Sequence, residues 1–303
     1  MKRLLTILSA MLLAASCAKV PDDGIVIVDD IDSPTPQGQP QEEQTEEQEQ
    51  TQSTVLKLTE CPAPKGGNSI IVVNKDDEYG INYFLEWDCD KRAQRWTAYQ
   101  MHKGNSASNV KRSNDEAWHE DEQIPDEYRS TYDDYRYSGF DRGHICPSAD
   151  RLQNTNMNYQ TFCYSNVHPQ YNSLNAAIWG DMENKVRAWN NDSFRDTLYI
   201  VKGGTIDKKD QVFDFKTQGS YGVVIPKYFF MAILCVKNNQ YKALGFWIEH
   251  KKSYSDIEGK SIKQYAVSID QIEESTGIDF FHNLPDDIEA KVESELTVGD
   301  WNF

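Results

Sequence analysis

The chain has 303 residues, a formal net charge of −17 and 26% charged residues. This length is enough for one large domain with a proper hydrophobic core. The acidic balance argues against a protein that binds nucleic acid tightly along its backbone, because such proteins are usually basic. It still allows an enzyme whose few arginine residues converge on one cleft.

The N-terminus has the pattern of an export signal. Lys2 and Arg3 precede an apolar run over residues 4–13, and three small residues then lead to Cys17. The run is too short to span a bilayer, so residues 1–16 are expected to be a signal peptide. The small residues before Cys17 resemble a bacterial lipobox, although Ala stands where Leu is usual. We expect a lipidated Cys17 and an exported, membrane-anchored lipoprotein, periplasmic or at the cell surface. Ordinary cleavage that leaves Cys17 free is the alternative.

An acidic segment follows the export signal. Residues 21–54 hold ten acidic side chains and no Lys or Arg, with a run rich in Gln, Glu and Thr. Such a composition buries too little apolar surface to offset the entropy of ordering. Residues 17–54 are therefore predicted to be a disordered tether, and residues 55–303 one catalytic domain. The first 20 residues contribute +3 and the tether −10, so the total of −17 leaves −10 on the domain.

The domain reads as many strands with a few helices inserted. The β-like segments in chain order are 69–73, 83–87, 95–101, 198–202, 221–225, 228–236 and 241–249. Helical patterns cover 174–189, 269–275 and 285–296, and the polar stretch 102–138 is expected to be a long loop with a helical turn. This arrangement predicts an α+β fold with a central, mostly antiparallel sheet.

The cysteines do not indicate a metal site. No pair has the CxxC spacing of a zinc site. Export permits disulfides, but an odd number leaves at least one thiol unpaired, and the pairing cannot be read from sequence. The five that follow Cys17 are Cys61, Cys89, Cys146, Cys163 and Cys235.

The chemically informative residues lie between positions 135 and 187. The string Asp141-Arg142-Gly143-His144 comes first, and Asn175, Trp179, Glu183 and Arg187 follow at intervals of four. On a helix that interval places the four side chains along one face. The opposite face is apolar and can be buried.

These residue types suit phosphodiester hydrolysis. A histidine is the side chain whose pKa suits a general base near neutral pH, and arginines bind phosphate oxygens bidentately. A hydrated Mg²⁺ prefers oxygen ligands and keeps most of its waters, so one amide and one carboxylate suffice. His144, Arg142 with Arg187, and Asn175 with Glu183 supply these parts.

The same residues resemble a known family, the DNA/RNA non-specific endonucleases, which include secreted sugar-non-specific bacterial nucleases and endonuclease G. The resemblance rests on the Asp-Arg-Gly-His string and the residues that follow it, and extends to segments 83–99, 224–230 and 268–284. The residues downstream of His144 that carry it are Ser165, Asn166, Pro169, Gln170, Asn175, Trp179 and Glu183.

The resemblance implies a ββα-metal site and a role for each residue. His144 would be the general base on a hairpin strand, and Asn175 the direct Mg²⁺ ligand that opens the motif's helix, with Mn²⁺ or Ca²⁺ as substitutes. Glu183 would hold metal-bound waters. The residues expected to contact phosphate are Arg142, Arg187 and, from the upstream strand, Arg95 or less plausibly Arg92. Those expected to support the site are Asp141, which braces the turn, and Asn166, which fixes the hairpin against the helix.

Each assignment has a plainer alternative. His144 taken alone would be an ordinary surface or core histidine, and Asn175 could be only a helix N-cap. Glu183 and Arg187 could be only a surface ion pair at i,i+4. Trp179 is interpreted as a packing residue, with base stacking as the minor alternative. Cys146, two residues from His144, is interpreted as structural rather than nucleophilic.

The resulting hypothesis is a secreted or surface endonuclease that hydrolyses DNA and RNA without sequence specificity. The alternatives are a surface lipoprotein that binds ligands on a nuclease scaffold, and a phosphodiesterase specialised for a small nucleotide. An unperturbed histidine predicts that activity falls below about pH 6.5. The preference between DNA and RNA, the membrane concerned and the oligomeric state stay open.

Overall fold

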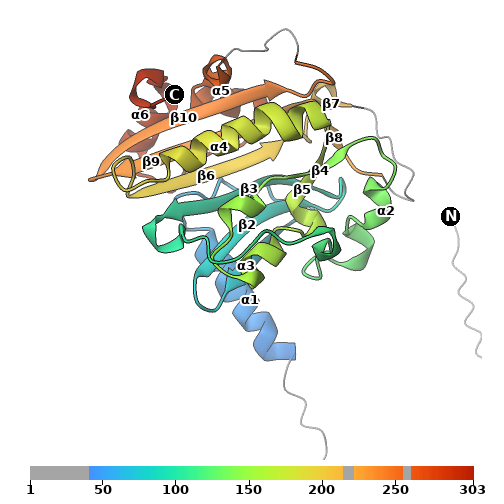
Figure 1. Cartoon of the computed structure of the whole chain (residues 1–303). Helices are drawn as coiled ribbons and strands as arrows, with labels where there is room; N and C mark the ends of the chain where they lie inside the picture. Colours follow the sequence, from blue (N-terminus) through green and yellow to red (C-terminus); the bar gives the residue numbers. More distant parts are fainter. Residues whose placement is uncertain (1–40, 214–221, 255–260) are drawn as a thin grey trace, which may run out of the picture. The chain divides into compact units, whose positions relative to one another are not determined.

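A seven-stranded sheet forms the centre of the computed structural model, which describes residues 41–213, 222–254 and 261–303 (Figure 1). All neighbouring strands are antiparallel. In spatial order they are β1 (Ser69–Asp76), β2 (Gly80–Asp88), β3 (Ala93–His102), β6 (Thr197–Gly204), β9 (Tyr228–Lys237), β10 (Gln240–Glu249) and β11 (Ala266–Val267). The fold class predicted from the sequence is confirmed.

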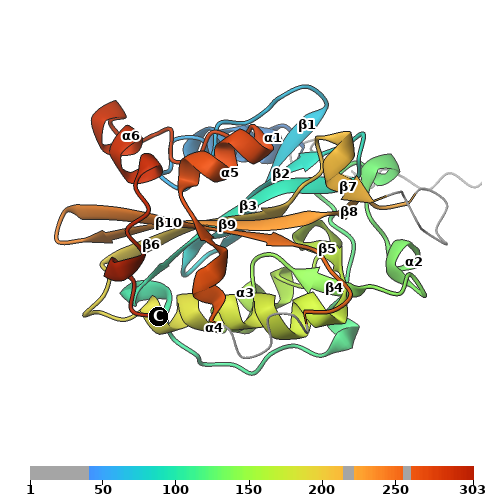
Figure 2. The ribbon, with the colours of Figure 1, turned by 90° about the horizontal axis from the view of Figure 1, so that it is seen from above.

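Different elements cover the two faces of the sheet, as Figure 2 shows with the sheet seen edge-on. On one face lie α1 (Gln41–Val55), α5 (Ile269–Thr276) and α6 (Asp286–Ser294). On the other lie α3 (Thr155–Gln160), α4 (Gly180–Trp189) and a small antiparallel pair of β4 (Asp141–His144) and β5 (Val167–Gln170). The β4–β5 pair and α4 therefore lie on the same face of the sheet, and these elements carry Arg142, His144, Glu183 and Arg187.

Shorter elements complete the chain. The pair β7 (Val212–Phe213) and β8 (Ile225–Pro226) is antiparallel, and α2 (Tyr132–Tyr135) follows the long loop. The 3-10 turns are Lys103–Asn105, Asp115–Ala117, Asp126–Tyr128, Ser148–Asp150, Tyr164–Asn166, Lys209–Gln211, Ile262–Tyr265 and Val298–Asp300. The segment 102–138 is thus a loop with several helical turns, as predicted.

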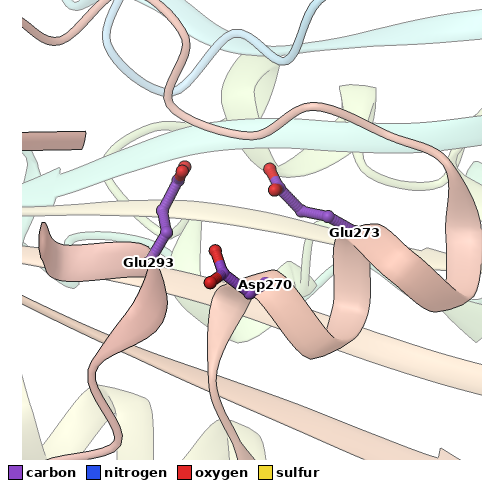
Figure 3. Close-up of side chains that lie close together, drawn as sticks. All are labelled: Asp270, Glu273 and Glu293. Atoms are coloured by element: carbon purple, nitrogen blue, oxygen red, sulfur yellow. The ribbon is translucent and has the colours of Figure 1, made fainter. Parts of the chain in front are cut away.

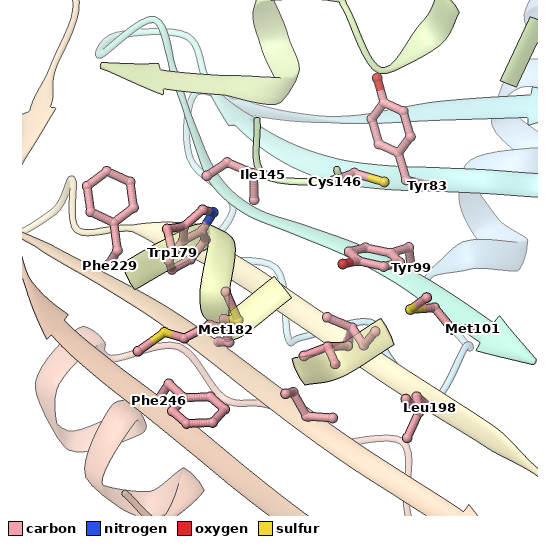
Figure 4. Packing of buried hydrophobic residues seen from close by; sticks show 14 of the residues in the cluster. Tyr83, Tyr99, Met101, Ile145, Cys146, Trp179, Met182, Leu198, Phe229 and Phe246 are labelled. Carbon is pink, nitrogen blue, oxygen red and sulfur yellow. The ribbon is translucent and has the colours of Figure 1, made fainter. Parts of the chain in front are cut away.

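Apolar residues of α4, together with Trp179 from the turn just before it, fix this helix to the sheet. Trp179, Met182 and Val186 are at most 1% exposed and belong to one cluster with strand residues such as Tyr99 and Phe229 (Figure 4). Trp179 contacts Phe229 with ring centroids 5.6 Å apart, which agrees with its interpretation as a packing residue. The polar face of the helix is therefore held at a fixed orientation towards β4.

A second core lies on the opposite face. Ile269 and Ile272 of α5 and Val292 of α6 pack there with residues of the central strands. The start of α5 follows from its sequence, because the Ser268 hydroxyl accepts a hydrogen bond from the Gln271 backbone amide and the Gln271 side-chain oxygen accepts one from the Ser268 backbone amide. Gly277 ends the helix in the left-handed conformation.

Two local predictions need correction. The predicted tether ends in a helix: α1 spans Gln41–Val55, Gln52 donates a hydrogen bond to the Ile71 carbonyl, and Val55 is fully buried. Packing against β1 therefore orders a segment whose composition alone predicts disorder. The rest of the tether, with Cys17, lies outside the described residues. Within the predicted strand 221–225, Val223 and Val224 are buried without strand pairing, and only Ile225 enters a strand, β8.

Candidate active site

The string Asp141-Arg142-Gly143-His144 forms strand β4, which pairs along its whole length with β5. Gly143 is required there because a Cβ atom at this position would overlap the buried Gln170 side chain. Asn166 closes the hairpin beyond His144: its Oδ1 accepts the Cys146 amide at 2.9 Å and its Nδ2 donates to the Cys146 carbonyl at 2.9 Å. The structure thus gives Asn166 a bracing role within the hairpin.

Asn175 faces this hairpin from a π-helical turn, Leu174–Trp179, that precedes α4. Its Nδ2 donates to Asp141 Oδ2 at 3.0 Å, and Asn172 donates to the same oxygen at 2.9 Å. Asp141 therefore orients the Asn175 amide, which corresponds to the predicted brace. Because Asn175 lies inside the turn and Ser173 takes the N-cap position, the alternative of a simple N-cap does not apply.

Glu183 is held by a lysine that the sequence did not identify. Lys202, fully buried on β6, donates to Glu183 Oε1 at 2.9 Å and to the Ile145 carbonyl at 3.0 Å. Burial raises the pKa of Glu183, and the Lys202 ammonium opposes that shift. The Lys202 ammonium thereby links α4, the residue that follows β4 and the central sheet.

His144 sits in an aromatic enclosure. Its ring lies 4.9 Å from Trp118 and 5.0 Å from Phe162, measured between centroids, and its buried Nε2 has no hydrogen-bond partner among the described residues. Burial is the largest influence on its pKa, followed by the positive charges of Arg112, Arg142 and Lys202, and together they lower it to about 3. The ring is neutral at physiological pH, as a proton acceptor must be.

The two arginines predicted at the site have different environments. The Arg142 guanidinium stacks over the Trp118 ring at 4.4 Å from its centroid, and no ion pair of Arg142 is found among the described residues. Arg187 donates to Asp150 Oδ1 at 2.7 Å and remains 27% exposed. Glu183 pairs with Lys202 and Arg187 with Asp150, so they do not form the surface pair considered from sequence.

The assignment of Arg95 to phosphate binding is wrong. Arg95 is 3% exposed, and its guanidinium contacts Glu86 at 2.7 Å, Asp88 at 2.5 Å and Asp207 at 2.9 Å. Burial alone would raise the pKa of Asp207, but Arg95 together with Lys91 and Lys65 holds it well below its usual range. Arg92, the alternative, is also buried and pairs with Asp134 at 3.0 Å. Both arginines are committed to the structure of the sheet and of the loop beside it.

Three residues near the site escaped the sequence reading. Lys202 supports Glu183, Trp118 covers His144, and Arg112 is an exposed cation whose charge acts on the His144 pKa. Trp118 and Arg112 belong to the 102–138 loop, and Lys202 to a strand. Their positions in the chain carry no local motif, because only tertiary packing brings them to the β4 hairpin.

The residues fit a hydrated divalent cation. Since the Asn175 amide nitrogen is engaged by Asp141, its Oδ1 is left free, and no donor to it is found among the described residues. Glu183 adds a carboxylate whose Oε2 has no hydrogen bond in the described part of the chain. Amide and carboxylate oxygens are the ligands that Mg²⁺ prefers, and few are needed because it keeps its waters.

The cysteines take no part in this chemistry. All five of the described domain are buried and free. Burial raises the pKa of Cys146 to about 12, so the thiolate needed for attack is not formed at physiological pH. The interpretation of Cys146 as a structural residue agrees with this environment.

A separate acidic group lies on the opposite face of the sheet. Asp270 and Glu273 of α5 and Glu293 of α6 point towards one another, with oxygens within 4.8 Å (Figure 3). Burial and the neighbouring carboxylates raise the pKa of Glu293 to about 9. Within the described part of the chain, no hydrogen bond or ion pair joins a histidine or arginine to these three carboxylates, whereas histidine and arginine side chains lie together at the β4 site.

The arrangement is that of a ββα-metal nuclease: the β4–β5 hairpin carries His144, and the π-helical turn and α4 that follow it carry Asn175 and Glu183. The chain belongs to the DNA/RNA non-specific endonuclease family, because the sequence model of that family matches residues 71–287. It is thus placed among the nucleases, and a divalent cation is the cofactor that the family implies. The resemblance inferred from the motif is confirmed.

Relatives agree over most of the domain. A nuclease from Nostoc sp. is 28% identical over 222 residues, covering 71% of this chain and 76% of the relative. Mitochondrial endonuclease G from Bos taurus is 27% identical over 213 residues, covering 67% and 68%. A solved chain from the EndoG/EndoGI complex has a TM-score of 0.60 and 23% identity, covering 73% of this chain and 89% of its own. That structural likeness supports the fold.

Proposed function

We propose that the protein is an endonuclease that hydrolyses phosphodiester bonds of DNA and RNA without sequence specificity, with His144 as general base and Mg²⁺ held by Asn175. The observation that carries the proposal is the convergence on one hairpin–helix unit of three groups: a neutral histidine, an amide oxygen and an arginine. Among the described residues the amide oxygen has no donor and the arginine has no ion pair. Mn²⁺ and Ca²⁺ are the candidate substitutes for Mg²⁺.

His144 would accept the proton of the attacking water. In the free enzyme the positive charges around it hold its pKa low. A phosphodiester brings a negative charge beside the same arginines, which raises the pKa of His144 towards its usual range as substrate binds. The base would thereby become stronger at the moment when it is needed.

The arginines and the cation share the phosphate charge. Arg142, stacked on Trp118, would bind a non-bridging oxygen, and exposed Arg112 takes the place predicted for Arg95 as a further contact. Arg187, which is partly exposed and held in position by Asp150, would bind another phosphate oxygen. When bound, the divalent cation would stabilise charge on the leaving oxygen. Glu183, positioned by Lys202, would orient its water shell.

The test is cleavage of supercoiled plasmid and of single-stranded RNA by the purified protein. With Mg²⁺ we expect open-circular and then linear DNA, the products of internal cleavage, and loss of both substrates. EDTA, His144→Ala and Asn175→Ala should each abolish cleavage. His282→Ala, a histidine beyond α5 and away from the site, is the matched control and should retain activity. Intact substrates at high protein with Mg²⁺ and Mn²⁺ would overturn the proposal and favour a specialised phosphodiesterase or a binding protein.

We also propose export and anchoring through Cys17. The support is the basic, apolar and small-residue pattern before Cys17. No helix in the described part of the chain is long and apolar enough to cross a membrane. Metabolic labelling with palmitate in a bacterial host should mark the wild type and fail to mark Cys17→Ser. Labelling that survives the substitution would refute the anchor.

A further inference from the structure

A hollow of about 410 Å³ opens beside the catalytic hairpin, within the size range of small-molecule pockets. Aromatic rings and arginines make up most of its wall. The lining residues that matter here are Trp118, Tyr132, Arg136, Tyr137, Phe140 and Arg142. Because Arg142 and Trp118 also contact one another, and Trp118 contacts His144, this wall is shared with the catalytic site.

Two tyrosines and an arginine stand at the pocket in an unusual arrangement. Tyr137 is 79% exposed and Tyr132 54% exposed, two of the four exposed large apolar side chains found in the described part of the chain. The Arg136 guanidinium lies over both rings, 5.4 Å from Tyr137 and 5.8 Å from Tyr132. Its contact with Asp133, 3.4 Å, is an exposed pair of the kind that contributes little. The exposed rings of Tyr132 and Tyr137 therefore contribute little to the free energy of folding.

The backbone at Tyr137 adds to this observation. Tyr137 has a φ of 56°, in the left-handed region that a bulky side chain rarely adopts. Exposed as it is, the ring makes few contacts that could compensate for this conformation. Strained residues of this kind gather at ligand-binding sites, where the fold holds them in place for use. The strain therefore points to a ligand that covers the ring.

We propose that this pocket binds an unpaired base of the nucleic-acid substrate, stacked on Tyr137 and Tyr132 with Arg136, while Arg142 binds the adjoining phosphate. This inference rests on the proposed function. Aromatic rings and arginine planes bind the face of any base, so the contact requires no sequence. A base inside a duplex is already stacked and cannot enter the pocket without being extruded. The enzyme should therefore prefer single strands, and duplexes should be cleaved more slowly.

The experiment compares three substrates: a single-stranded oligonucleotide, the same strand with abasic sites at the linkage cleaved, and its duplex. For the wild type we expect kcat/KM on the ordinary strand to exceed that on the abasic strand by on the order of tenfold, the effect of one stacked base. Tyr137→Ala should lower kcat/KM on the ordinary strand to the value on the abasic strand, and should change kcat/KM on the duplex by less than about twofold. The matched control is Tyr159→Ala, an exposed tyrosine 44% accessible on α3, which should behave as wild type.

Binding without cleavage separates this proposal from the function on which it rests. In EDTA, the affinity for the labelled single strand should fall on the order of tenfold in Tyr137→Ala and less in Arg136→Lys, which keeps the charge but loses the plane. Equal losses on ordinary, abasic and duplex substrates, or unchanged binding, would overturn the base subsite. A wild type that cleaves nothing but shows the Tyr137-dependent binding would refute the proposed hydrolysis and leave the subsite standing.

Discussion

Replacing Lys202 by Met should weaken both the fold and the site, because this buried ammonium is the partner of Glu183. Their charged atoms are 2.9 Å apart. At an effective dielectric of 20 that distance corresponds to about 6 kcal/mol of attraction, part of which offsets desolvation. Removal of one partner from a buried pair costs about 3–5 kcal/mol, so we expect Lys202→Met to lose about 3 kcal/mol of unfolding free energy.

Denaturant unfolding of a double-mutant cycle is the assay. Lys202→Met and Glu183→Gln each leave one group without its partner, whereas the double variant leaves neither charge buried alone. We therefore expect the double variant to be more stable than the sum of the single changes predicts, by at least about 2 kcal/mol. A coupling under about 0.5 kcal/mol would refute the reasoning that Lys202 holds Glu183. Activity should be lost in all three, since Glu183 is either displaced or neutral.

Three further predictions concern other charged groups. Arg95→Ala should lose about 3–5 kcal/mol in denaturant unfolding, because buried Glu86 loses its cationic partner and Asp88 and Asp207 keep only lysine partners, while kcat/KM of the folded enzyme stays near wild type. A selective loss of kcat/KM would return Arg95 to the site. The lowered pKa of His144 keeps the ring neutral well below pH 6.5, so kcat/KM should change less than about twofold between pH 7.5 and 5.5, where an unperturbed histidine would lose about tenfold. An acid limb at pH 6.5 in protein that circular dichroism shows to be folded would contradict this. The raised pKa of Glu293 means that the folded state binds a proton that the unfolded state has released, so its stability falls as pH rises from about 4.5 towards 9. Glu293→Gln should raise the free energy of unfolding by roughly 1 kcal/mol at pH 8, and so Tm by a few degrees, and should leave Tm unchanged at pH 4. The same gain in Tm at both pH values would show that the protonation of Glu293 is not the cause.

The catalytic hairpin and helix could be predicted from sequence because their signals are local. Asp141-Arg142-Gly143-His144 is a contiguous strand, and the four-residue intervals through Asn175, Trp179 and Glu183 predict a helical segment that carries both polar side chains. The apolar stripe opposite them also follows the helical period. Only the π-helical turn at Asn175 could not be foreseen, since no spacing rule separates it from a regular helix.

Long-range partners account for the failed assignments. Arg95 was predicted to contact phosphate because it lies on a strand within a family-like segment, but its partner Asp207 lies 112 positions further along the chain. Lys202 was read as one residue of a strand, and its role depends on Glu183, which another element supplies. In the same way Val55 and Gln52 order α1 through contacts with the sheet that composition does not record.

The pKa of His144 likewise depends on tertiary contacts that the sequence does not reveal. A reference value near 6.5 assumes water around the ring, whereas His144 is enclosed by Trp118 and Phe162. Neither aromatic residue adjoins it in the sequence. The expectation that activity falls below pH 6.5 is therefore replaced by the prediction that His144 stays neutral in the free enzyme well below that pH.

The acidic character of the domain is compatible with a nucleic-acid substrate once the charges are located. Several cations are committed to the interior, among them Arg95 and Lys202, while Arg112, Arg136 and Arg142 gather around the β4 hairpin. Charges interact over about 8 Å at physiological salt, so carboxylates on the far face, such as the α5–α6 group, have little influence on a phosphate at the site. A few local arginines supplemented by base stacking would bind the substrate without a basic surface. Such binding should also depend less steeply on salt than that of a protein that neutralises many phosphates, because fewer counterions are released.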